Sequence, residues 1–254
     1  MKFGAQALSP RESPGEGRAP AKREPDRAKH QEKGARVRAG ETTFRHSSPH
    51  PALRARPLPE GEGFYNMMNL VLASQSPRRK ELLAVLGYPF TVVPSSIDET
   101  PKPGENPETF VVRVAREKAM EVASRVAHSV VLSADTVVTI DNEILGKPED
   151  EQDALSMLRK LSGRDHLVYT AVTVVNQLKQ EALDGLDRTR VWFASLTDEE
   201  ILGYIRRENV LDKAGAFAIQ GYACVYIPKI EGNYFNVMGL PLPLVHQLLC
   251  RTLS

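Results

Sequence analysis

The sequence predicts an α/β fold in which helices flank a mixed β-sheet. From residue 68 onward, short runs rich in β-branched residues alternate with segments whose apolar residues recur at helical spacing. Two neighbouring strand-like runs, 167–175 and 189–196, are joined through a turn within 177–187, which predicts an antiparallel pair. Alternation together with a hairpin favours a mixed sheet over a purely parallel one.

The first 66 of the 254 residues differ in composition from the rest. They are rich in Pro, Gly, Arg, Lys, Glu and Ser and almost empty of Ile, Val and Leu. Such a segment cannot bury enough apolar surface to offset its ordering entropy, so we expect 1–66 to be disordered. Acidic residues such as Glu12 argue against a nucleic-acid arm or a targeting peptide. Because Met67 directly precedes the first strand, we favour a mis-set translation start or a functionally silent tail, followed by one domain over 67–254.

Composition excludes several classes of protein. The formal net charge of +1 combines a basic first segment with a mildly acidic remainder, so we expect no nucleic-acid surface on the folded part. No apolar run is long enough to span a bilayer, and the N-terminus has no signal-peptide core. Cys224 and Cys250 form no metal-binding spacing, which suits a reducing cytosol. These features predict a cytoplasmic protein.

The chain opens on a strand followed by a capped helix. The apolar run 70–73 predicts a buried strand, Ser76 stands at the helix N-cap position, and Pro77 takes the first helical position. Arg78 and Arg79 fall in the first turn, where the helix dipole disfavours cations. An anion bound at the free N–H groups would reverse that penalty. The stretch is therefore explained equally well by a phosphate site and by a solvated basic turn.

The remaining elements continue the alternation. We expect further strands at 90–94, 130–134, 137–140, 167–175, 189–196 and 222–227. We expect further helices at 107–127, from the acidic stretch 149–153 to about 163, 197–209 and 243–253. Loops are expected at 95–107, 212–221 and 233–241.

Charged residues stand at strand ends and in loops rich in Gly and Pro. Asp135 ends an apolar strand, where an aspartate serves as a metal ligand or general base, or merely forms a turn. Glu99 lies in a proline-rich loop, Lys147 projects from a Gly-Lys-Pro turn, and Lys118 lies on a predicted helix. Taken singly, each of the last three is better explained as a solvated surface charge.

The Gly-rich stretch DKAGAFAIQG is a further candidate. It carries Lys213 and Gln220, and its glycines would let the backbone approach a ligand closely, or would simply make a flexible loop. Walker A, GxGxxG, HExxH and GxSxG motifs are absent from the sequence. Acids combined with several Lys and Arg, and without a nucleophile–base pair, are expected for Mg²⁺-assisted hydrolysis of a phosphate ester.

Taken in order, these motifs resemble those of the Maf family of nucleoside triphosphate pyrophosphatases. The resemblance covers essentially all of the chain from Asn69 onward. The matching pieces are LASQSPRRKELL, the acid in SSIDET, VVRVAREKA, SADTVV, ILGKP, LSGRDHLVYTAV, DKAGAFAIQG and NVMGLPL. The chain departs from the family at 209–211, where relatives often carry Glu-Pro.

The resemblance implies a single elongated α/β domain, related to the inosine-triphosphate pyrophosphatases and often dimeric. It implies cleavage of a nucleoside triphosphate to the monophosphate and pyrophosphate with a divalent cation, Mg²⁺ or Mn²⁺. By match to the family motifs, the catalytic positions are Asp135 as proton acceptor, Glu99 and Lys147, with Glu99 and Asp135 holding the metal. The matching substrate-binding positions are Ser74, Arg79, Lys118 and Lys213.

Substrate choice also follows from the resemblance. Arg78, Thr136 and Gln220 match the members that act on dTTP and UTP, whereas those acting on 7-methyl-GTP tend to carry Trp, Gln and Glu there. A neutral amide at Gln220 can both donate to and accept from a uracil or thymine edge. Modified pyrimidine triphosphates are included in this expectation.

Two alternatives stay open. The first is the same chemistry on 7-methyl-GTP or another modified purine triphosphate. The second is a nucleotide-binding regulator of cell division or septum formation with little catalysis, a role also associated with the family. Retention of Asp135, Glu99 and Lys147 favours catalysis, because a protein that only binds needs no acid to activate water.

Overall fold

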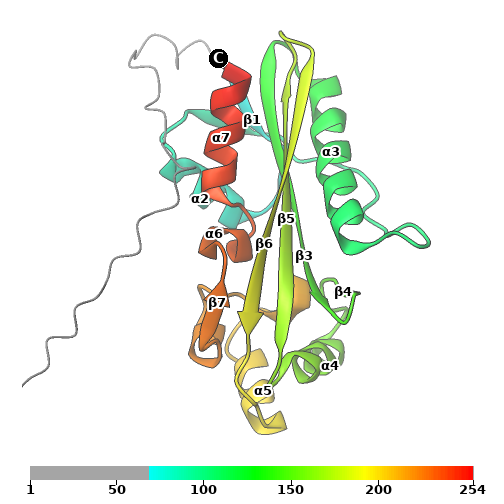
Figure 1. The fold of residues 1–254 in the computed structure, drawn as a ribbon, viewed down its shortest axis with the longest axis vertical. Helices are drawn as coiled ribbons and strands as arrows, with labels where there is room; N and C mark the ends of the chain where they lie inside the picture. The colour runs from blue at the N-terminus through cyan, green and yellow to red at the C-terminus, as the bar shows by residue number, and fades with distance from the viewer. Residues whose placement is uncertain (1–68, 254) are drawn as a thin grey trace, which may run out of the picture. The chain divides into compact units, whose positions relative to one another are not determined.

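One seven-stranded mixed sheet organises the part of the chain that the structure, a computed structural model, describes, residues 69–253 (Figure 1). The predictions for 1–66, and the domain start at 67, lie outside these residues. The strands are β1 (Asn69–Leu72), β2 (Phe90–Val92), β3 (Ser129–Ile140), β4 (Glu143–Leu145), β5 (Asp165–Asn176), β6 (Glu181–Trp192) and β7 (Lys229–Glu231). The helices are α2 (Pro77–Val85), α3 (Pro107–Arg125), α4 (Glu151–Leu161), α5 (Asp198–Ile205), α6 (Tyr234–Met238) and α7 (Leu242–Leu253), with 3₁₀ turns η1 (Ala214–Ala216) and η2 (Tyr222–Tyr226).

The strand order is β2-β1-β3-β5-β6-β7, with β4 paired to β3. β1 runs parallel to β2 and β3, whereas β3, β5, β6 and β7 pair antiparallel. Twelve-residue strands β3, β5 and β6 form the long central part of the sheet. The predicted α/β class with a mixed sheet is therefore confirmed.

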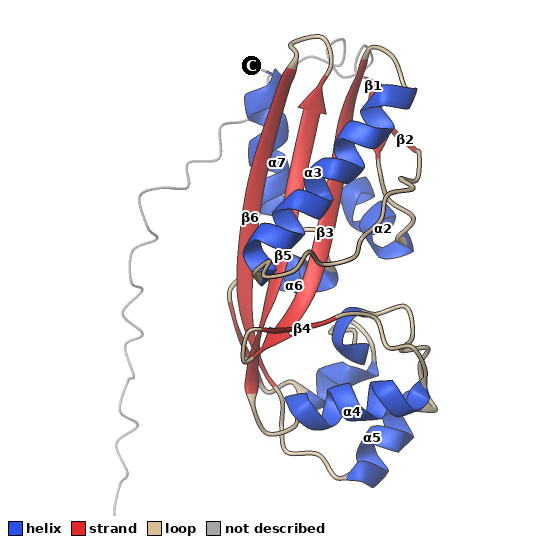
Figure 2. Ribbon diagram, turned by 90° about the vertical axis from the view of Figure 1, so that its right-hand side faces the viewer, coloured by secondary structure: helices blue, strands red, loops and turns tan. Residues whose placement is uncertain are grey.

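Helices cover both faces of the sheet (Figure 2). α3 packs on one face, where its apolar side meets alternate residues of β3 and β5. α2 and α7 pack on the opposite face. α4 and α5 close the end of the sheet beyond β4. No helix within 69–253 has the length and apolar character needed to cross a membrane.

The edge of β3 has a gap between two partner strands. β1 pairs with β3 as far as Leu132, and β4 pairs with the same edge from Val138 onward. Among the described strands, none pairs with 133–137 on this edge. Asp135 and Thr136 lie in the gap and, as neighbours in a strand, point to opposite faces of the sheet. Side chains from both helical layers can therefore meet there, at the carboxyl end of β1.

Most predicted elements are present, and their local signals explain why. α2 begins as expected, with Ser76 accepting a hydrogen bond from the Arg79 N–H and Pro77 at its first position. α3 is capped by Asn106 and buries its predicted apolar side. α5 begins with the predicted capping box between Thr197 and Glu200, although it ends at Ile205 rather than near 209.

The predicted strand at 222–227 is wrong, because these residues form η2. The edge of β6 is taken instead by β7, three residues later. Tyr222 and Tyr226 meet edge to face at 5.8 Å, a contact that suits a helical turn and not a strand. The Glu208 carboxylate also accepts a hydrogen bond from the Tyr222 N–H and holds the start of this turn.

Two further boundaries differ from the predictions. The expected loop at 233–241 contains α6, which Asn233 caps by accepting the Phe235 N–H at 2.9 Å and which ends at left-handed Gly239. β6 begins at Glu181, eight residues before its predicted start. One side of β6 is exposed, so its polar residues resemble a turn in sequence although they belong to the strand.

Candidate active site

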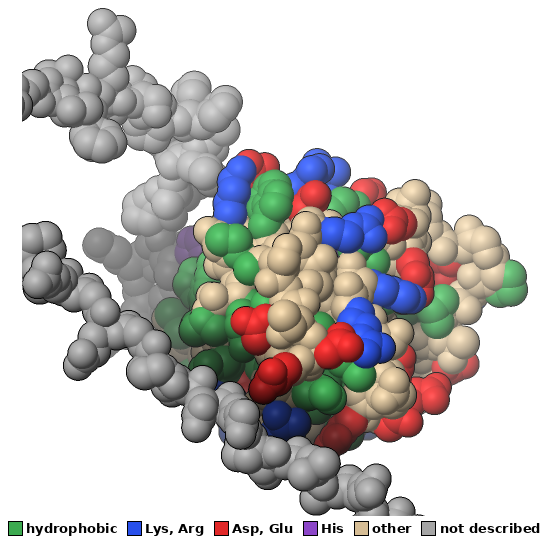
Figure 3. Space-filling view, turned by 90° about the horizontal axis from the view of Figure 1, so that it is seen from below, with side chains coloured by type: hydrophobic (Ala, Val, Ile, Leu, Met, Phe, Trp, Pro, Cys, Tyr) green, Lys and Arg blue, Asp and Glu red, His purple; other side chains and the backbone are tan. Residues whose placement is uncertain are grey.

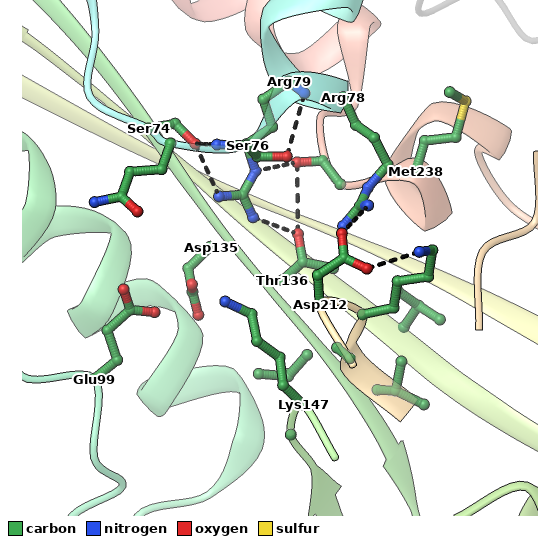
Figure 4. A pocket seen from close by; sticks show the side chains of 18 of the residues that line it. Ser74, Ser76, Arg78, Arg79, Glu99, Asp135, Thr136, Lys147, Asp212 and Met238 are labelled. Atoms are coloured by element: carbon green, nitrogen blue, oxygen red, sulfur yellow. Dashed lines mark hydrogen bonds and ion pairs between the residues drawn. The ribbon is translucent and has the colours of Figure 1, made fainter. Parts of the chain in front are cut away.

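A cavity of about 1000 Å³ opens at the gap in the β3 edge. Figure 4 shows the side chains that converge on it from α2, β3, and the loops before α3 and after β4. All ten residues singled out in the sequence line this cavity: Ser74, Arg78, Arg79, Glu99, Lys118, Asp135, Thr136, Lys147, Lys213 and Gln220. Residues far apart in the chain thus form one site.

Two carboxylates share one ammonium group on the α3 side of the gap. The Nζ of Lys118 lies 2.9 Å from Asp135 Oδ1 and 2.7 Å from Glu99 Oε2. Lys118 and Asp135 are only 5% and 6% exposed, whereas the Glu99 side chain is about half exposed. A buried lysine requires such partners, so Lys118 belongs to the site and is not the surface charge that it resembles in isolation.

The environment of Asp135 suits a general base. Burial raises the pKa of its carboxyl above the usual value, while the positive charges of Lys118 and Arg79 act in the opposite direction. A carboxylate with a raised pKa accepts a proton more readily than an exposed one.

On the other face, Arg79 is held in a cradle of oxygen atoms. Its Nε donates to the Gly239 carbonyl at 2.8 Å, its Nη2 to Thr136 Oγ1 at 3.0 Å, and its Nη1 to Ser74 Oγ at 3.5 Å. Ser74 also accepts the Ser76 N–H, which ties the turn before α2 to the same point. Burial lowers the pKa of Arg79, and the carboxylates of Asp135 and Glu99 counteract this shift.

The neighbouring Arg78 belongs to the outer part of the cavity. Its Nη1 lies 3.1 Å from Asp212 Oδ2, and their side chains are 27% and 48% exposed. Asp212 is also paired with Lys213 at 2.7 Å, and the Lys213 ammonium donates to the Asn209 carbonyl. Asn209, in the segment that departs from the family pattern, therefore anchors the lysine that follows it.

Lys147 and Gln220, like Glu99, are exposed members of the site. Both line the cavity, and Figure 4 shows Lys147 extending toward Asp135. The loop that carries Lys147 is joined to η1, because the Gly215 N–H donates to the Gly146 carbonyl at 2.9 Å. Gly215 has φ +65°, and a Cβ there would approach the Val138 side chain to 3.0 Å, so this glycine allows close packing on β3.

The donor chemistry of Glu99 and Asp135 fits a hard divalent cation. Carboxylate oxygens are the ligands that Mg²⁺ prefers, and both already face one positive charge, the Lys118 ammonium. Within 69–253, no cluster of three or more His, Cys, Asp or Glu side chains could hold a metal alone. Mg²⁺ is commonly bound by one or two carboxylates together with substrate phosphates, and Glu99 and Asp135 could supply the carboxylates.

The structure adds residues that the sequence did not single out. Asp212, Gly239, Thr170 and Asn236 bond to the predicted residues or to their partners. Asp212 could have been noticed as the acid beside Lys213. Thr170 lies within a β-branched run and Asn236 within an expected loop, so neither carried a local signal.

Comparisons with known proteins agree on one family. Residues 69–252 match the family described as Maf-like protein. The chain is 44% identical over 185 residues to a dTTP/UTP pyrophosphatase of Caldanaerobacter subterraneus subsp. tengcongensis, covering 72% of this chain and 89% of the relative. It is 49% identical over 174 residues to a dTTP/UTP pyrophosphatase of Geotalea uraniireducens, covering 68% and 90%.

Among solved structures, the Staphylococcus aureus Ham1 protein shows a slight likeness. The superposition has a TM-score of 0.38 with 14% identity and covers 50% of this chain and 72% of that chain.

Proposed function

The chain belongs to the Maf family, and we propose from this premise that it is a nucleoside triphosphate pyrophosphatase that hydrolyses dTTP and UTP to the monophosphate and pyrophosphate. The relatives cited above carry the name of this activity and are matched over most of their length. Modified pyrimidine triphosphates belong to the same proposal.

One observation carries the proposal: a single cavity gathers a buried carboxylate and five basic side chains. A triphosphate needs positive charge to bind, and its hydrolysis needs a group that accepts a proton from water. Asp135 supplies the acceptor, and its raised pKa supports that role. The basic residues are Arg78, Arg79, Lys118, Lys147 and Lys213.

The buried cations suit the phosphates at the point of cleavage. Lys118 and Arg79 flank Asp135 from the two faces of the sheet. Lys147 extends toward the same carboxylate (Figure 4). Their N–H groups are placed before substrate arrives, so charge that develops on the phosphate oxygens meets fixed donors. Ser74 keeps the turn before α2 in place.

A divalent cation, Mg²⁺ or Mn²⁺, would be held by Glu99 and Asp135 and would neutralise phosphate charge when bound. Because Lys118 lies between these carboxylates, its ammonium competes with the cation for them. We therefore expect tight metal binding only together with the nucleotide, which brings further oxygen ligands.

The outer part of the cavity suits recognition of the base. Gln220 is exposed on the cavity wall, where its amide can donate to and accept from a pyrimidine edge. Arg78, on α2 with Asp212 as its partner, lines the same cavity. A glutamate at position 220 would suit the positive charge of 7-methyl-GTP instead.

The direct test is pyrophosphate release from a panel of nucleoside triphosphates with Mg²⁺ or Mn²⁺. We expect release from dTTP and UTP by the wild type and loss of release in Asp135→Ala. Release only from 7-methyl-GTP would overturn the substrate assignment. Binding of a triphosphate without release of pyrophosphate from any of them would favour the nucleotide-binding regulator over the enzyme.

Two further expectations accompany the proposal. A homodimer in solution, which light scattering would detect, follows from the family resemblance alone. Cytoplasmic location follows from composition, and fractionation of cells that express the chain would check it.

A further inference from the structure

A chain of hydroxyl groups runs from Arg79 into the core on the α6 side of the sheet. Arg79 Nη2 lies 3.0 Å from Thr136 Oγ1, which lies 3.0 Å from Thr170 Oγ1, which lies 2.9 Å from the Asn236 carbonyl oxygen. Thr136 and Thr170 are direct cross-strand neighbours in the register of β3 and β5. Thr170 and Asn236 are fully buried.

The direction of every hydrogen bond in this chain is determined by its two ends. A carbonyl oxygen only accepts, so Thr170 donates its one hydroxyl hydrogen to Asn236. Thr170 must then accept from Thr136, which uses the one hydrogen of Thr136. A guanidinium only donates, so Thr136 accepts from Arg79. The Thr136 hydroxyl thus has no hydrogen left to donate to a substrate.

The inner end of the chain is itself anchored. The Asn236 amide donates to the Val168 carbonyl at 3.0 Å and to Thr189 Oγ1 at 2.9 Å, which joins α6 to β5 and β6. Gly239 at the end of α6 accepts from Arg79 Nε. The short helix α6 therefore holds the guanidinium at two points, once directly and once through the two threonines.

We propose that Thr170 is a positioning residue for the reaction, and the proposal rests on the function proposed above. Acting through Thr136, Thr170 orients the guanidinium plane of Arg79 so that its remaining N–H groups are available for the substrate phosphates. Thr136 then acts on the phosphate end of the substrate by way of Arg79, because its hydroxyl has no hydrogen left to donate to the base.

Thr170→Val tests this because valine keeps the branched shape and removes the hydroxyl. Without an acceptor at Thr170, the Thr136 hydrogen turns toward the Gly239 carbonyl, 3.5 Å away, which already accepts from Arg79 Nε. The rotation moves the lone pair that faces Arg79 Nη2, so both bonds that orient the guanidinium are weakened. We expect the KM for dTTP to rise about three- to tenfold, the cost of one hydrogen bond, with a smaller change in kcat. Thr170→Ser restores the hydroxyl and is expected to restore KM.

Thr173→Val is the matched control. Thr173 is fully buried in the same strand, but its hydroxyl donates to Asp184, away from the site. An equal rise in KM in this variant would show that any lost buried hydroxyl has the same effect, and would overturn the proposal. Melting temperatures of all variants separate loss of fold from loss of positioning.

A double-mutant cycle sharpens the test. In a Thr136→Val background the link to Arg79 is already broken, so Thr170→Val should raise KM little further. Full additivity would contradict the proposed route through Thr136. The ratio of KM values for dTTP and UTP should stay unchanged throughout, because the effect lies at the phosphates.

Nucleotide affinity, measured by calorimetry with dTTP and no divalent metal, separates this proposal from the proposed function. If the wild type binds dTTP in calorimetry but releases no pyrophosphate from it when Mg²⁺ is supplied, and Thr170→Val binds dTTP three- to tenfold more weakly while Thr173→Val does not, then the positioning role stands and the enzyme function fails. If hydrolysis is normal in every variant, the positioning role fails and the enzyme function stands.

Discussion

The two ends of the cavity differ in how their charges are held. At the inner end, Arg79, Lys118 and Asp135 are partly or fully buried, and each is bonded to an element of the sheet or its helices. At the outer end, Arg78 and Gln220 are accessible to solvent, and Arg78 is paired only with another exposed side chain. Adjacent arginines on one helix thus have different environments.

This difference follows from the cost of burying charge. A buried ion is tolerated only with partners, and those partners orient it before any ligand arrives. An exposed pair is screened by water and contributes little, so its members can change without loss of the fold. The inner end therefore suits the reaction, which is common to all nucleoside triphosphates, and the outer end suits discrimination among bases.

The largest effect is expected from Asp135→Asn at the inner end. An amide cannot accept the proton, so kcat should fall about 10²- to 10⁴-fold. The substitution also removes one carboxylate partner of the buried Lys118 ammonium and leaves Glu99 as the other, so the variant should melt at a lower temperature than the wild type. Asp165→Asn, an exposed carboxylate paired with Arg190, is the matched control. Wild-type kcat in Asp135→Asn would refute the assignment of the base.

His166 lies against an apolar wall of the cavity. This histidine packs between Phe193 and Phe217 at ring distances of 5.6 and 5.3 Å, and Phe217 lines the cavity. Burial lowers the pKa of His166 to about 4, so the folded protein binds fewer protons than the unfolded chain below the unfolded pKa of 6.5. The neutral form of His166 therefore costs no stability above pH 6.5. The free energy of unfolding should fall by about 3 kcal/mol as the pH drops from 6.5 toward 4.

His166→Leu should flatten this decline, which urea denaturation at about pH 7 and about pH 4 would measure. His128→Asn, in an exposed turn, controls for the loss of a histidine as such. An unchanged slope in His166→Leu would show that His166 does not cause the decline in stability at low pH.

Lysine substitutions at the two arginines compare the ends directly. Arg79→Lys removes the forked donor set that reaches Thr136 and Gly239, and should weaken dTTP affinity about 10- to 100-fold. Arg78→Lys keeps the charge of an exposed pair, and should change affinity less than about fivefold. Steady-state KM values for dTTP measure both, and equal effects would remove the distinction between the ends.

The smallest effect is expected from Asp212→Asn. Asp212→Asn removes two ion pairs, with Arg78 and with Lys213, and each should contribute no more than about 1 kcal/mol to the free energy of unfolding. Removal of a negative charge beside Arg78 should lower KM for dTTP by at most about threefold at low salt, and the change should vanish at high salt. An effect that persists at high salt would mean that Asp212 holds the outer end rigidly.

Local signals explain which elements were predictable. The start of α2 is recognisable from two adjacent residues, the Ser76 cap and Pro77, and the buried side of α3 is recognisable from the spacing of its apolar residues. Both are as expected. The segment 222–226 carries a strand-like composition but forms a turn, because β7 already occupies the edge of β6. Tertiary competition for an edge cannot be read from composition.

The sequence by itself determined the residue types of the site and their order along the chain, and all ten line the cavity. Only the tertiary structure decided their partners. Lys118 lies between Glu99 and Asp135, and Arg79 reaches Gly239 from 160 residues away, because sheet register and helix packing bring these side chains together. The same register pairs Thr136 with Thr170. Propensity and capping act over a few residues, whereas a buried charge takes whichever partner the packed elements place beside it.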